Sequence, residues 1–194
     1  MMRKIVIPIL ILLAVGALII ALATDRGAKL PDDTHNGNAT STLDFVAYTA
    51  PADAYTVQYP RSWRLNESPP VEGVATIITS PDAMAYVAIG FVENEALTEP
   101  GGTSQLIKEL EAALRANSDY TIDGFEERLV SDEIQGYSVS GQLRVPDGVL
   151  HFREVGVLVD TGVGFVVRGT MLEEGVAAHE DSVEAIVESF RIGE

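Results

Sequence analysis

Four basic residues in the C-terminal half of the chain could together bind an anion. They are Arg144, His151, Arg153 and Arg168. They stand out because the 194-residue chain has 13 Lys and Arg against 29 Asp and Glu. Guanidinium groups bind carboxylates and phosphates through charge-assisted hydrogen bonds. If these side chains share one surface, we expect a candidate site for an anion or an acidic partner. The competing interpretation is that nearby carboxylates, such as Glu127 or Glu154, neutralise the arginines.

Motifs that are similar to catalytic or cofactor sites fail on their spacing. Gly136-Tyr137-Ser138-Val139-Ser140-Gly141 is similar to a nucleophile elbow, but its second glycine is one place too far along the chain. His179-Glu180 begins a zinc-protease motif, yet Val183 stands where the second histidine should be. Gly162-Val163-Gly164 has Val167 in place of the third glycine of a dinucleotide-binding loop. We therefore expect no enzyme activity and no cofactor.

Metal sites are also not expected. The chain has no cysteine, which excludes disulfides and thiolate metal ligands. Asp123-Gly124 is a fragment of a calcium loop without the remaining ligands. Glu180, Glu184 and Glu188 form a stripe at i, i+4 spacing, which is typical of the solvated side of a helix. The alternative is that this stripe meets a basic partner.

The four basic residues lie in segments that predict two consecutive hairpins. If Asp147-Gly148 is a two-residue turn, Arg144 lies opposite His151. If Thr161-Gly162 is the next turn, Arg168 lies on the same face. These registers predict that all four basic side chains gather on one face of a sheet.

The rest of the C-terminal part predicts a series of strands interrupted by two helices. Runs rich in β-branched and aromatic residues are Phe45–Thr49, Tyr55–Tyr59, Val74–Thr79, Tyr86–Val92, Tyr120–Val130, Ile134–Val145, Val149–Asp160 and Gly162–Thr170. One amphipathic helix follows Thr103 as its N-cap, and another covers about Val176 to Phe190. Because tight turns join antiparallel strands and a single-faced helix must cover a sheet, the predicted class is α+β, with helices packed on an antiparallel sheet.

One segment resembles a known family. Ala54-Tyr55-Thr56-Val57-Gln58-Tyr59-Pro60-Arg61-Ser62-Trp63, followed by paired strands, a helix, three long strands and Ile186-Val187-Glu188-Ser189-Phe190, is similar to the PsbP-like domain. That family takes its name from an extrinsic subunit of the photosynthetic oxygen-evolving complex. The resemblance runs from Phe45 to Ile192 and implies an α/β/α sandwich. Its signature residues are Tyr59, Pro60, Trp63 and Phe190, and they are structural: the proline ends a strand and the tryptophan ring is buried.

The N-terminal segment predicts a membrane anchor. Ile5 to Ala23 is an unbroken run of apolar or small residues, long enough to cross a hydrocarbon core of about 30 Å as a helix. Arg3 and Lys4 precede the run, so the N-terminus is expected in the cytoplasm and the C-terminal part outside it. The alternative is secretion after cleavage of a signal peptide, because Ala21-Leu22-Ala23 fits a cleavage site. The predicted organisation is therefore an anchor or signal segment at 1–23, a flexible linker at 24–42 and one domain at 43–194.

Charge narrows the class of partner. Without Arg3 and Lys4, 11 basic residues face 29 acidic ones after residue 24, and such a charge repels nucleic acid. We expect a non-catalytic, membrane-tethered accessory or binding module with a protein partner in the cell envelope. The alternative is a sensor or scavenger domain that binds a small ligand or anion on the arginine-rich face.

Overall fold

A computed structural model describes residues 44–129, 134–159 and 162–193. The predicted span at Ile5 to Ala23 and the predicted linker at 24–42 lie outside the described residues. Within the described ranges, none of the helices combines the length and the apolar character needed to cross a membrane.

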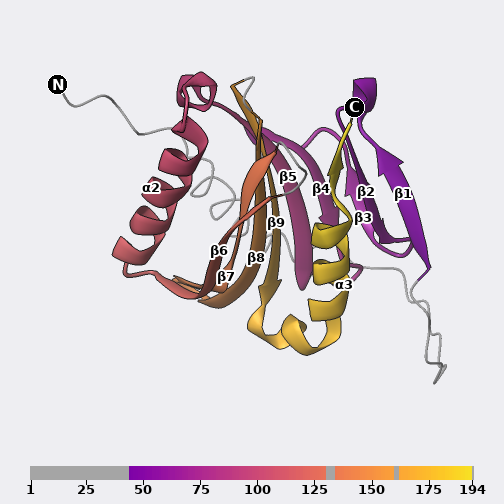
Figure 1. The fold of residues 1–194 in the computed structure, drawn as a ribbon. Coiled ribbons are helices and arrows are strands. Elements are labelled where there is room, and N and C mark those ends of the chain that lie inside the picture. The colour runs from indigo at the N-terminus through magenta and orange to yellow at the C-terminus, as the bar shows by residue number, and fades with distance from the viewer. Residues whose placement is uncertain (1–43, 130–133, 160–161, 194) are drawn as a thin grey trace, which may run out of the picture.

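The described domain is built on a large antiparallel sheet (Figure 1). Seven strands form it in the order β3-β4-β5-β9-β8-β7-β6. In that order their bounds are Arg64–Asn66, Val74–Thr79, Ala85–Glu93, Val163–Leu172, Gly148–Val159, Gln135–Val145 and Tyr120–Leu129. Apart from β3, all of them were expected from local pattern. β3 has only three residues, too few for an alternating pattern to be recognised.

A second, smaller sheet lies beside the first. It has the order β1-β2-β10, with bounds Phe45–Thr49, Tyr55–Pro60 and Arg191–Ile192. The two-residue β10 pairs with the first two residues of β2, so segments far apart in the sequence lie side by side. The prediction of an antiparallel α+β class is confirmed, but the strands form two sheets where one was expected.

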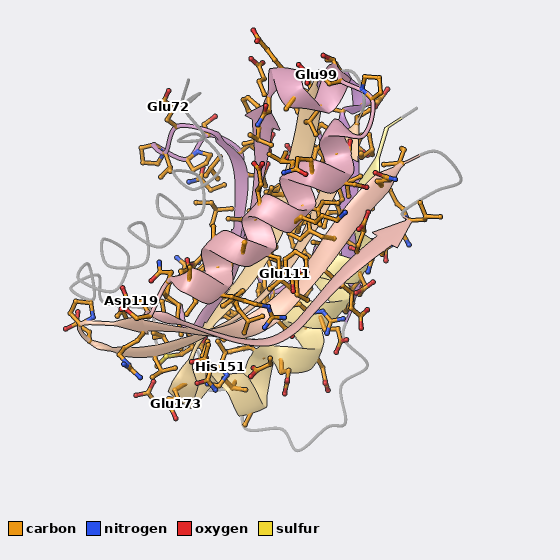
Figure 2. The ribbon with its side chains drawn as sticks, turned by 60° about the vertical axis from the view of Figure 1, so that its left-hand side comes forward. Glu72, Glu99, Glu111, Asp119, His151 and Glu173 are labelled. Carbon is orange, nitrogen blue, oxygen red and sulfur yellow. The ribbon has the colours of Figure 1, made fainter. Side chains whose placement is uncertain are left out.

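Two helices cover opposite faces of the large sheet, as Figure 1 shows. On one face lies α2, Gly102–Ala116, which buries Leu106, Ile107 and Leu114; Figure 2 views this face with α2 in front of the sheet. On the other face lies α3, Val176–Ser189, which shares its apolar cluster with residues of the small sheet. Short 3-10 helices lie in the connections: η1 at Pro51–Asp53, η2 at Glu95–Thr98 and η3 at Glu173–Gly175.

The predicted N-cap of α2 is wrong. The helix begins one residue before Thr103, and its N-cap is Gly101, with φ of 75° and no side-chain cap. This left-handed conformation favours glycine. A Cβ at Gly102 would collide with the backbone of Ala96 in η2, so the two glycines let the chain turn sharply from η2 into α2.

The signature residues pack around α3. Trp63 is buried as predicted, at 6% exposure, and its ring is nearly perpendicular to that of His179, with the centroids 5.6 Å apart. Pro60 is buried at the end of β2, Phe190 is buried after α3, and Tyr59 is half-buried. The signature therefore joins the small sheet and the end of α3 to one core.

Candidate functional site

The register of β7 and β8 differs from the prediction. Val145 pairs with Gly148, so the turn consists of Pro146 and Asp147. Proline has no N–H to donate to a ladder and its fixed φ favours a turn position, which explains the shift. Arg144 consequently lies opposite Val149 and not His151. The shift is two residues in the pairing, so the faces of the two strands stay as predicted.

The register of β8 and β9 places Arg168 on the opposite face of the sheet from the one predicted. Val159 pairs with Val163, which leaves three residues in the link where two were predicted. Gly162, with φ of 90°, has the left-handed conformation that a three-residue link uses. Arg168 therefore lies opposite Glu154, and the expectation that it lies opposite Val155 on the face of Arg153 is wrong. A slip of one residue in a strand moves its side chains to the other face.

The four basic side chains accordingly do not form one surface. Arg144 is exposed near the β7–β8 turn, and His151 and Arg153 are half-buried on the α3 face. Arg168 is 3% exposed and lies on the α2 face. Arg144 therefore shares this face with His151 and Arg153, which occupy neighbouring positions on β8, and only Arg168 is on the other face.

Arg168 belongs to a buried ionic cluster under α2. Its Nη1 lies 3.5 Å from Oε2 of Glu154, and its guanidinium carbon lies 4.3 Å from the centre of the Phe152 ring. The Tyr137 hydroxyl donates a 2.7 Å hydrogen bond to Oε1 of Glu154. Burial raises the pKa of Glu154, while the charge of Arg168 and the bond from Tyr137 oppose that rise. The cluster is shielded from any partner by the packing of the domain.

Arg153 is paired with carboxylates of α3. Its Nη1 lies 2.9 Å from Oε1 of Glu184, and its Nη2 lies 3.0 Å from Oε1 of Glu188. Arg128 on β6 also approaches Glu188, at 3.6 Å. Two members of the predicted glutamate stripe thus tie α3 to the sheet, so this side of the helix is not simply a solvated face.

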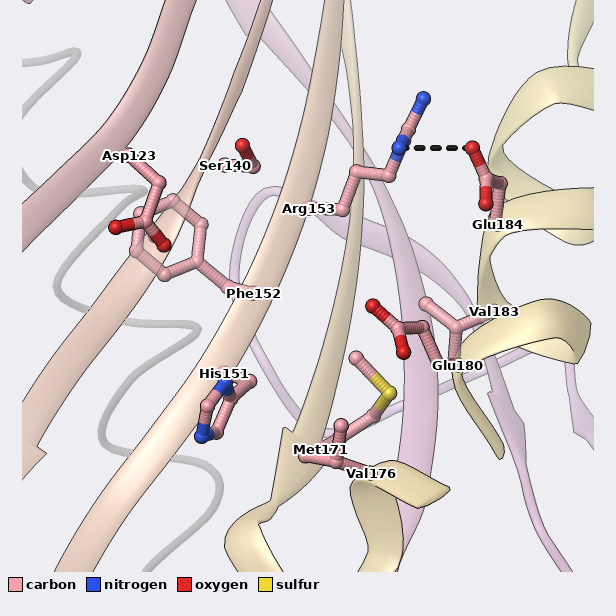
Figure 3. A pocket seen from close by; sticks show the side chains of 11 residues that line it. Asp123, Ser140, His151, Phe152, Arg153, Met171, Val176, Glu180, Val183 and Glu184 are labelled. Carbon is pink, nitrogen blue, oxygen red and sulfur yellow. Dashed lines mark ion pairs between the residues drawn. The ribbon is translucent and has the colours of Figure 1, made fainter. Parts of the chain in front are cut away.

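A pocket of about 190 Å³ lies where α3 crosses the sheet (Figure 3). Five elements supply its walls. Its lining residues are Asp123, Ser140, Gly141, His151, Phe152, Arg153, Met171, Val176, Glu180, Val183 and Glu184. The pocket therefore contains His151 and Arg153 from the predicted set, Glu180 and Glu184 from the glutamate stripe, and further residues that were not predicted as binding residues.

Asp123 reaches the pocket through an irregularity of β6. The pairing of β6 with β7 shifts between Ile122 and Gly124, so Asp123 is an extra residue on the bulged strand. Bulges redirect a side chain and often occur next to binding sites. Nothing in the local sequence beyond Asp123-Gly124 indicated this. Glu180 differs from Asp123, because the sequence already placed it in the glutamate stripe. The sequence did not show how α3 packs on the sheet, which is what places Glu180 in the pocket.

The arrangement suits binding by ionic and apolar contacts. Within residues 44–129, 134–159 and 162–193, no group of three His, Cys, Asp or Glu side chains is placed to hold a metal ion. Met171, Val176 and Val183 provide apolar surface in the pocket, while Asp123 and Glu180 provide negative charge.

Comparison with known proteins gives a family and a fold. The sequence profile of the PsbP family matches residues 43–192. The solution structure of cyanobacterial PsbP (CyanoP) from Synechocystis sp. PCC 6803 is similar, with a TM-score of 0.56 and 14% identity over 81% of this chain and 98% of that one. LpqN of Mycobacterium tuberculosis, a protein involved in cell envelope biogenesis, has a TM-score of 0.55 and 10% identity over 79% of this chain and 93% of its own. At these identities the likeness concerns the fold. No curated protein sequence matches significantly.

Proposed function

The chain belongs to the PsbP family, and on that premise we propose that its domain is a non-catalytic binding module tethered to a cell membrane, on the side away from the cytoplasm. The apolar run at Ile5 to Ala23 and its basic flank support the tether and its direction. The fold shared with LpqN, a protein of cell envelope biogenesis, is consistent with a role in the envelope.

The proposal that the domain is non-catalytic rests on the separation between the buried groups with shifted pKa values and the pocket. Catalytic acids and bases have shifted pKa values and touch the substrate in a cleft. Here Glu154 and Tyr137, whose pKa values are raised by burial, lie in the interior under α2. The pocket opens on the other face of the sheet, where Arg153 is engaged by Glu184 and Glu188. Glu154 and Tyr137 therefore do not line this pocket.

Membrane fractionation of the full chain tests the tether. We expect the protein to sediment with membranes and to resist extraction by high salt, because a spanning helix is held by apolar burial and not by charge. Recovery of a soluble form that begins at Thr24 would instead establish a cleaved signal peptide. If the full chain is retained in the membrane, chemical crosslinking in intact cells should capture an envelope protein with it.

Cysteine labelling tests the orientation, since the chain has no cysteine of its own. Ser118→Cys places a thiol at an exposed position in the loop after α2. A maleimide that does not cross membranes should label this variant in intact cells. The matched variant Met2→Cys should be labelled only after lysis, and the reverse result would overturn the proposed topology.

Binding of a small ligand is a second candidate function, and the pocket is the observation that favours it. An anion is the less suitable ligand there, because it would have to displace Glu184 or Glu188 from Arg153. Titration of the full chain with inorganic phosphate, followed by calorimetry, tests this candidate directly. Saturable binding that Arg153→Ala abolishes would favour the anion-binding function over the protein-binding one.

A further inference from the structure

We propose that the pocket between α3 and the sheet receives a positively charged side chain, a lysine or an arginine, from the partner protein. This inference rests on the proposed function of the domain as a binding module and names the chemistry of its partner. Size, charge and the apolar part of the lining each point to such an occupant.

The size of the pocket limits the occupant. Pockets that enclose drug-sized ligands or cofactors have volumes of about 300 to 1,000 Å³. The pocket here has about 190 Å³, so it suits one long side chain better than a cofactor. Its base is well supported, because β7 and β8 are paired without a break and the Arg153 ion pairs hold α3 against the sheet.

The charge of the lining selects a cation. Arg153 lies between Glu184 and Glu188, so its charge is balanced by carboxylates of α3. Asp123 and Glu180 line the same pocket, and in the described part of the chain neither has a basic group within ion-pair distance. The pocket therefore keeps unbalanced negative charge on two opposing walls, one on β6 and one on α3.

The polar and apolar parts of the lining fit the two ends of such a side chain. Met171, Val176 and Val183 offer apolar surface to an aliphatic stem, which lysine and arginine bury while the charged end stays hydrated or paired. The hydroxyl oxygen of Ser140 can accept a further hydrogen bond from an ammonium or guanidinium group. Figure 3 shows His151 and Glu180 on facing sides of the pocket. The acidic charge of the whole chain adds attraction for a basic partner at long range.

Methionine methyl signals of the full chain in detergent micelles provide the test. Among the four methionines of the chain, Met171 lines the pocket, whereas Met84 lies in the β4–β5 turn and serves as an internal control. We expect N-acetyl-lysine methylamide to shift the Met171 signal saturably and to leave the Met84 signal in place. The uncharged analogue N-acetyl-norleucine methylamide should bind at least about tenfold more weakly, because it lacks the charge-assisted hydrogen bonds.

Paired variants assign the effect to the pocket. Glu180→Gln removes one lining charge without changing the size of the side chain and should weaken binding of the lysine probe about tenfold. Glu174→Gln removes an exposed carboxylate of η3 outside the pocket and should leave binding unchanged. Equal binding of the norleucine analogue, or equal binding by the Glu180→Gln variant, would overturn the proposal.

Two further probes separate the possible occupants. If 1,5-diaminopentane binds at least about tenfold tighter than the blocked lysine, the occupant is a free amine and the inference of a partner's side chain is wrong. If inorganic phosphate shifts Met171 and the lysine probe does not, the pocket is an anion site, which also contradicts the inference. If no probe shifts Met171 while crosslinking still captures an envelope protein, the inference fails and the proposed function stands.

Discussion

Arg168 and Glu154 form an ion pair inside the domain, with Nη1 of the arginine 3.5 Å from Oε2 of the glutamate and both side chains almost fully buried. The two residues are direct cross-strand partners on β9 and β8. Aromatic side chains surround the arginine, which lies 4.3 Å from the centre of the Phe152 ring and 5.7 Å from that of Tyr120. A basic residue that seemed available for an external partner is thus part of the core.

Removal of one member of this pair should be costly. Arg168→Met leaves Glu154 without its cation, and Glu154→Gln leaves the arginine without its carboxylate; each should lower the free energy of unfolding by about 3 to 5 kcal/mol. The double variant Glu154→Gln/Arg168→Met leaves no unpaired charge, so it should cost less than the sum of the two. Denaturation followed by the fluorescence of Trp63 measures all three values.

The exposed pair of Arg61 and Asp44 provides the control for these variants. Its side chains are 67% and 68% exposed, although the two atoms lie 2.7 Å apart. Solvent screens such a pair, so Arg61→Met should change stability little. Additive costs at Glu154 and Arg168 would contradict the coupling inferred from the structure.

Trp63→Ala should destabilise the domain by about 3 to 5 kcal/mol, because it empties a large buried site. The ring is 6% exposed and lies at the meeting point of α3 and the small sheet. Trp63→Phe keeps part of the ring and should cost less. Circular dichroism is the suitable measurement, since the variants lack the tryptophan signal. An unchanged denaturation midpoint in Trp63→Ala would remove the structural role assigned to the signature.

Asp82 should make stability depend on pH in the acidic range. Burial acts to raise its pKa, but hydrogen bonds from the Ser80 hydroxyl, the His179 ring and the N–H of Met84 outweigh burial and lower the pKa below 3.8. A lowered folded-state pKa gives a contribution that is present above pH 3.8 and is lost as the pH falls through the folded pKa. The stability difference between wild type and Asp82→Asn should therefore shrink in that window.

Denaturation of both proteins at several pH values measures this difference. Asp82→Asn keeps the size of the side chain and removes its titration. A difference that stays constant below pH 3.8 would mean that the hydrogen bonds to Asp82 do not lower its pKa in the folded state.

Gly156→Ala should displace the ring of Tyr137. The two residues are cross-strand partners on β8 and β7, and a Cβ at position 156 would overlap the ring atoms. We expect a loss of about 1 to 3 kcal/mol from overpacking, together with a weaker hydrogen bond from Tyr137 to Glu154. Gly124→Ala is the matched control, because its Cβ would meet only Ser140 Oγ, at 3.4 Å. Equal stability changes in the two variants would contradict this packing.

The positions of most strands and of both helices follow from the sequence, because each depends on a short-range period. Alternation of apolar residues indicated the long strands, and the three- and four-residue spacing of apolar positions indicated α2 and α3. The short strands β3 and β10 were not predicted, because two or three residues are too few to show an alternating pattern. Their pairing depends on distant partners, as β10 beside β2 illustrates.

The candidate site depended on relations that local patterns do not contain. One additional residue in the link between Val159 and Val163 placed Arg168 inside the domain, since strand side chains alternate with a period of two. The glutamates of α3 were visible as a stripe, but only the docking of the helix paired two of them with Arg153 and left Glu180 in the pocket. The sequence by itself determined the elements, the acidic balance and the signature around Trp63. The tertiary structure decided which charges neutralise each other, because that depends on distances of a few ångströms between residues far apart in the chain.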